Sequence, residues 1–190
     1  MVGQERGRDR GDMKILAIGG PLFLLAYGLL RLVDGIDGSH GPGWAWNVGH
    51  AFFLVAFLMF GALVWKLRDV SVVASIAALA GSAAFVWVIL GDLFDDLPGL
   101  PDPLMLAGPL LFQVGVLALL TILAIRRVVP AWSPVLVLVG FVLFAVNIDL
   151  LPLGALLLLA GLSPLTEAEG RGPHRRGERA DQSVQRRDGS

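Results

Sequence analysis

The sequence predicts an all-α, polytopic membrane helix bundle of six transmembrane helices, of which the last two are short. The 190-residue chain is 55% hydrophobic and 16% charged, with a mean hydropathy of +0.72, so it is far more apolar than a soluble domain. Its apolar runs approach the ~20 residues that a helix needs to cross a bilayer. The runs lack the alternation of barrel strands, which leaves a helix bundle.

The N-terminal part divides into a lead, a span and a loop. Residues 1–12 are polar and of mixed charge, so we expect a disordered lead. Residues 15–33 form the first span, because their apolar run is too long for a signal peptide and no cleavage site follows. Residues 34–47 are rich in glycine and form a loop, at whose end Trp44 and Trp46 mark a membrane interface.

The second and third spans are expected at residues 48–65 and 70–90. The third carries a stripe of small residues, which are Ala74, Ala77, Ala78, Gly81 and Ala84. Small side chains let neighbouring helix backbones approach closely in a membrane. We therefore expect the third span to be the central packing helix.

A loop at residues 91–103, with four aspartates, three prolines and no basic residue, separates the two halves of the chain. The fourth span follows at residues 104–125. Residues 131–165 are too long for one upright span, and we expect two short helices, with one broken helix as the alternative. Ser133 and Asp149, each just before a proline, are expected to cap the fifth and sixth helices.

The distribution of positive charge predicts that both termini are cytoplasmic. With six spans, every Lys and Arg of the 15 in the chain except Arg31 lies on the cytoplasmic side. With five spans, the arginine-rich tail moves outside and the split becomes nearly even, which fits the positive-inside rule poorly. Residues 166–190 are then a disordered, polar cytoplasmic tail.

The transmembrane domain, residues 13–165, contains a faint internal echo. The tripeptide Gly-Pro-Leu at residues 20–22 recurs at residues 108–110. Three spans in each half, residues 13–92 and 103–165, would make an inverted repeat, which is a transporter trait. Chance similarity between apolar segments is the alternative interpretation.

Six spans place nearly every side chain with ligand or acid–base potential on the extracytoplasmic side. These side chains are Asp34, Asp37, His40, Asn47, His50, Asp92, Asp95, Asp96, Asp102, Asn147 and Asp149. Imidazole and carboxylates together suit a divalent cation, and His50, Asp92 and Asp149 are the candidate metal ligands. A hydrogen bond from His50 to a neighbouring helix and a solvated Asp92 are the simpler alternatives. Gln113 is the plainly polar side chain deep in the membrane, where an interhelical hydrogen bond is expected.

The functional prediction is correspondingly general. The absence of cysteine excludes disulfides, thiolate metal sites and a cysteine nucleophile, and no catalytic motif or cofactor motif gives support for an enzyme. We expect a small multi-pass plasma-membrane protein, acting as a non-catalytic accessory or interaction protein with an acidic extracytoplasmic face. The alternatives are a small secondary transporter, a cation-responsive membrane protein or, with less support, a membrane enzyme using His50 and the outer aspartates. Expected partners are the lipid bilayer and a second copy or another membrane protein; nothing indicates nucleic acid.

Overall fold

The computed structural model describes residues 2–35, 43–94 and 96–168, and these residues form helices and no strand. The helices are α1 (Val2–Asp34), α2 (Trp44–Lys66), α3 (Val72–Leu93), α4 (Asp102–Ile125), α5 (Trp132–Val146), the 3-10 helix η1 (Ile148–Leu150), α6 (Leu151–Leu162) and α7 (Leu165–Ala168). Asp37, His40, Asp95 and the tail from residue 169 onward lie outside the described residues.

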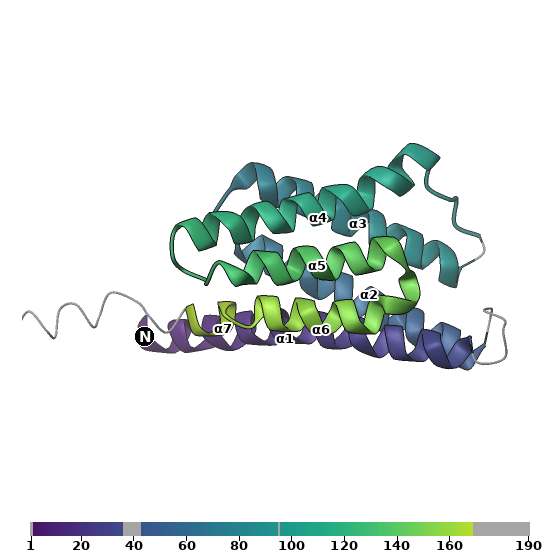
Figure 1. Cartoon of the computed structure of the whole chain (residues 1–190), viewed down its shortest axis with the longest axis horizontal. Coiled ribbons are helices and arrows are strands. Elements are labelled where there is room, and N and C mark those ends of the chain that lie inside the picture. Colours follow the sequence, from purple (N-terminus) through teal and green to yellow (C-terminus); the bar gives the residue numbers. More distant parts are fainter. Residues whose placement is uncertain (1, 36–42, 95, 169–190) are drawn as a thin grey trace, which may run out of the picture.

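The six main helices form a closed ring in chain order. Each helix from α1 to α6 contacts the next, and α6 returns to contact α1 (Figure 1). Helix α3 is one member of this ring, between α2 and α4, so the prediction that it would be the central helix was wrong. The centre of the ring contains side chains from several helices and no helix backbone, so none of the six helices is central.

Within the described part of the chain, five apolar segments are long enough to cross a membrane, which confirms the prediction of an all-α polytopic bundle. They are Gly11–Asp34, Trp44–Lys66, Val72–Leu93, Asp102–Ile125 and Ile148–Glu167. Helix α5 is also apolar but has only 15 residues, or about 22 Å of helix. The last segment reaches 20 residues because η1 and α7 extend α6 at its two ends.

Helix α1 extends back to Val2, through residues for which we expected disorder. Adding a residue to an existing helix gains one hydrogen bond without the cost of nucleation. The lead contains no proline that would stop this extension.

The two expected helix caps differ from the structure. Helix α5 begins without a side-chain cap; Ser133 is fully buried, and its Oγ donates a hydrogen bond to the carbonyl oxygen of Gly161 on α6. At the second break, Oδ1 of Asn147 accepts a hydrogen bond of 2.9 Å from the backbone amide of Asp149. Asn147 therefore starts η1, as asparagine often does by bonding to the backbone two residues on. Pro152 lies in the first turn of α6, as expected.

The small-residue stripe of α3 brings its backbone against that of α4, as we predicted. A Cβ atom on Gly81 would overlap the amide nitrogen of Phe112. One built on Gly115 would lie 2.6 Å from the carbonyl oxygen of Ala74. The two helices are thus in backbone contact at glycines on both sides of the seam.

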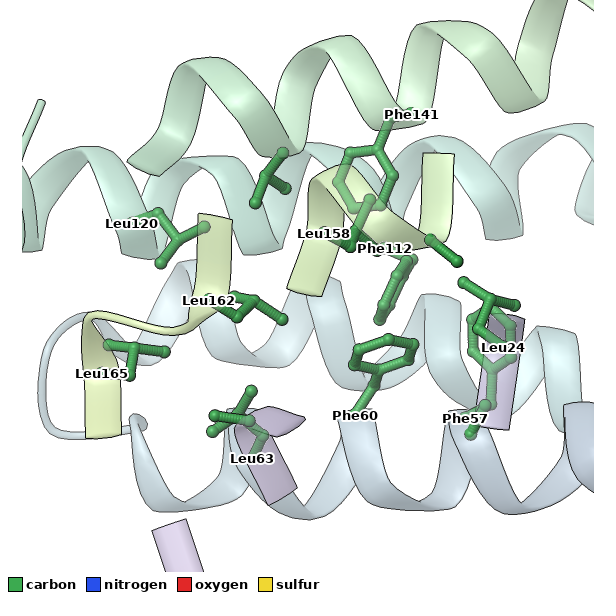
Figure 2. Packing of buried hydrophobic residues seen from close by; sticks show 14 of the residues in the cluster. Leu24, Phe57, Phe60, Leu63, Phe112, Leu120, Phe141, Leu158, Leu162 and Leu165 are labelled. Carbon is green, nitrogen blue, oxygen red and sulfur yellow. The ribbon is translucent and has the colours of Figure 1, made fainter. Parts of the chain in front are cut away.

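Phenylalanine side chains from α2, α3, α4 and α5 fill the centre of the ring. The rings of Phe57 and Phe85 stack with centroids 4.0 Å apart. Phe112 lies 5.1 Å from Phe57 and 5.9 Å from Phe141, and Leu158 closes the cluster from α6 (Figure 2). Aromatic pairs at such distances add about 0.5 to 1.5 kcal/mol each beyond their burial.

Candidate functional site

The charged residues of the bundle gather at its two ends. One end, here called the acidic pole, holds Asp34, Asp92, Asp96, Asp102 and Asp149. The other, the basic pole, holds Lys66, Arg68, Arg126 and Arg127. Contacts between distant parts of the chain join each set: Arg31 lies near Asp149 at the acidic pole, and Arg126 donates to the carbonyl oxygen of Val70 at the basic pole.

His50 is buried one to two turns inside α2, about 9 Å below the start of that helix. Its Nδ1 donates a hydrogen bond of 2.9 Å to the carbonyl oxygen of Trp46, so in the neutral ring Nε2 carries a lone pair. That Nε2 lies 3.5 Å from Oδ2 of Asp92. A proton added at Nε2 therefore turns this contact into an ion pair between α2 and α3.

Aromatic rings enclose the imidazole on its other sides. The indole of Trp46 lies 4.1 Å away, and Tyr27 of α1 presents its ring edge-on at 5.5 Å between centroids. Tyr27, Trp46 and His50 also help to line a small pocket of about 10 Å³, which is the space of about one water molecule.

Arg31, the basic residue that six spans leave on the outer side, lies beside this pocket. Its Nε is 3.8 Å from Oδ1 of Asp149, which is an ion pair but too long for a hydrogen bond. Among the described residues, the same Nε and the Oδ2 of Asp34 are buried and find no hydrogen-bond partner. The Arg31–Asp149 pair links the end of α1 to η1 and so closes the ring at this pole.

The structure thus brings together two of the three candidate metal ligands. His50 and Asp92 are adjacent, whereas Asp149 lies against Arg31. Among the described residues, no three His, Asp or Glu side chains are close enough to hold a metal ion. Metal binding at the acidic pole stays a prediction, and His50 and Asp92 are the two candidate ligands that lie next to each other.

Gln113 lies half-buried on α4, at the wall of a cavity of about 320 Å³ between α4 and α5. Its amide makes no hydrogen bond with any described residue, so the expected interhelical hydrogen bond is not formed. Instead, serines make such bonds: Ser82 Oγ donates to the carbonyl oxygen of Phe57 at 2.9 Å, and Ser133 bonds to Gly161.

Sequence reasoning missed the cavity and the roles of Tyr27 and Arg31. The sequence did contain a signal for Arg31. It is the one basic residue that six spans place on the extracytoplasmic side, among many aspartates, so an ion pair with one of them could have been predicted. No comparable signal marks the cavity, which depends on how closely α4 and α5 approach.

Comparisons of this chain with protein-family models, with characterised proteins and with solved structures found no match. The fold and the ends of the bundle nevertheless define the class: this is an integral, multi-pass membrane protein of the α-helical type. What it does is argued below from its own surfaces.

Proposed function

We propose that this protein is a non-catalytic accessory or interaction protein of the plasma membrane, with cytoplasmic termini and the acidic pole outside. The positive-inside rule supports the orientation, because Lys66, Arg68, Arg126 and Arg127 share the basic pole. The interaction role rests on one feature of the lipid-facing surface.

That feature is a shallow groove on the outer face of α3 and α4, here called the alanine groove. It has a volume of about 280 Å³; Ala80 and Ala83 are exposed along it, whereas Ala84 and the buried Gly108 form its floor, where α3 and α4 pack on each other. The larger side chains of Trp87 and Leu111 form part of its wall. Helices associate in membranes through small residues that admit a second backbone, so a groove of this composition suits a transmembrane helix of a partner or of a second copy.

The packed centre of the ring supports interaction over transport. A transported polar substrate needs a site near the middle of the membrane, and ionisable groups usually mark such a path. Here the clustered rings of Phe57, Phe85 and Phe112 occupy that position, and no ionisable side chain of the described residues lines the cavity beside them. A transporter would have to part these rings in every cycle.

The absence of cysteine makes the groove directly testable. A single cysteine at Ala83, inside the groove, is compared with one at Val142 on the lipid-facing side of α5, each labelled with benzophenone maleimide and irradiated in native membranes, so that the partner needs no cysteine. We expect a covalent dimer, or a discrete adduct with one other membrane protein, for Ala83→Cys and neither for Val142→Cys. Equal, diffuse cross-linking at both positions, or none at either, would overturn the proposal.

A further inference from the structure

The cavity between α4 and α5, here called the lateral cavity, has a volume of about 320 Å³ and lies within the apolar part of the bundle. It is bounded by residues of all six main helices, among them Leu24 of α1 and Leu151 of α6. A neighbouring internal space towards the basic pole, lined in part by Phe60 and Leu63, measures only about 20 Å³. A void of about 320 Å³ is at the lower end of the range for small-molecule sites.

The cavity opens to the lipid. Helices α4 and α5 contact each other least among the neighbouring pairs of the ring. The lining residues Leu106, Leu110 and Ile148 are all exposed on the outside of the bundle, Leu106 to 69%. Because Leu106 and Leu110 are apolar and exposed on a helix long enough to span the membrane, we expect a ligand to reach the cavity through the membrane and not from water.

Aromatic rings form most of the deep wall. Phe57, Phe85, Phe112 and Phe141 all line it, and flat rings prefer to stack or to meet edge-to-face with centroids about 4.5 to 7 Å apart. Such walls suit a planar ring better than a flexible chain alone.

Of the described residues that line the cavity, Gln113 alone has a polar side chain. It lies eleven residues into α4 from Asp102, about 16 Å from the acidic end and hence near the middle of the bilayer core. An amide carries two N–H donors, and it is costly to leave them unpaired where water is absent. The amide of Gln113 has no partner among the described residues, so a ligand with an acceptor oxygen at this depth would complete the site.

We propose that the lateral cavity binds a lipid-soluble molecule with a carbonyl-bearing ring and an apolar tail, the chemistry of an isoprenoid quinone. The ring lies among the phenylalanines, one carbonyl oxygen accepts a hydrogen bond from Gln113, and the tail leaves between α4 and α5. An acyl chain of a phospholipid fits the opening but has no polar atom at this depth, so it leaves the amide unpaired.

The test uses the full-length protein in detergent micelles with two probes, decylubiquinone and a long-chain alkylbenzene, which has the ring and tail but no carbonyl. Ligand affinity is measured from the concentration dependence of the thermal shift. We expect decylubiquinone to bind more tightly, and Gln113→Leu to weaken its binding about tenfold while the alkylbenzene is unaffected. A tenfold change corresponds to about 1.4 kcal/mol, which is typical of one hydrogen bond.

Ala145→Trp, at the mouth of the cavity on α5, should weaken binding of both probes and serves as a second variant if Gln113→Leu does not fold. Three results would overturn the proposal. The first is that decylubiquinone does not bind. The second is that both probes bind equally and Gln113→Leu has no effect, which indicates that the cavity only takes up apolar molecules. The third is that both probes bind to Ala145→Trp as they do to the unchanged protein. None of these depends on whether the alanine groove binds a partner.

Discussion

Replacing Gly81 by alanine should separate α3 from α4. A Cβ at this position would lie 2.5 Å from the carbonyl oxygen of Gly108 and closer still to the amide nitrogen of Phe112. Both atoms belong to the backbone of α4, so neither can rotate away, and the helices must move apart by roughly 1 Å to restore ordinary contact. A gap of that size forfeits about a quarter to a half of the dispersion attraction of each pair of atoms across the seam.

The magnitude follows from two opposing effects. Overpacking costs about 1 to 3 kcal/mol, and the rigid neighbours at Gly81 place it near 3, whereas alanine gains about 1 kcal/mol over glycine in helix propensity. We expect a net loss of about 2 kcal/mol for Gly81→Ala. Gly91, in the same helix, is the matched control because a Cβ added there would meet nothing within 4 Å, so Gly91→Ala should be neutral or stabilising by up to about 1 kcal/mol.

The assay is unfolding in mixed micelles by titration with dodecyl sulfate, followed by far-ultraviolet circular dichroism. The two variants should differ by about 2 to 3 kcal/mol in the free energy of unfolding. If they unfold at the same dodecyl sulfate fraction, the close approach of α3 and α4 at Gly81 is refuted.

Three further predictions concern the ends and seams of the bundle. Arg127 has a φ of 58° just after α4, where glycine is favoured, so Arg127→Gly should stabilise the protein by about 1 kcal/mol in the same titration; a loss of stability would contradict this. Ser82→Ala removes the hydrogen bond to Phe57 and should cost about 0.6 to 1.7 kcal/mol, and a neutral result would show that the bond contributes nothing. Millimolar calcium or magnesium should raise the melting temperature by relieving repulsion at the acidic pole, and His50→Ala with Asp92→Asn should reduce this response. An equal effect of monovalent salt at matched ionic strength would leave only screening.

The helix class and the number of apolar segments could be predicted from the sequence, because both depend on local composition. The close packing of α3 against a neighbouring helix could also be predicted, because glycine and alanine at helical spacing in a membrane span usually mark a helix–helix contact. The role of Ser133 was not predictable, because a serine before a proline has the same local pattern whether it caps its own helix or bonds to a neighbour. Only the approach of α6, at Gly161, decides between them.

The candidate site was predictable in part for a similar reason. Topology alone places His50 and Asp92 at the same end of the bundle, but their distance of 3.5 Å depends on the rotation of α2 against α3. Asp149 shows the limit of this reasoning, because the partner nearest to it in space, Arg31, is far away in the chain. The unpaired amide of Gln113 likewise becomes visible only when the space between α4 and α5 is known.

The location of the C-terminus tests the six-helix membrane topology most directly, because α5, with 15 residues, is a shorter apolar segment than the 20 residues that η1, α6 and α7 form together. A reporter fused after residue 190 is compared with reporters after residue 127 and within residues 34–47. Six crossings predict that the first two report the cytoplasm and the third reports the outside. A C-terminal reporter on the outside, with the other two unchanged, would show that α5 and the following segment do not both cross, and would contradict the proposed orientation of the acidic and basic poles.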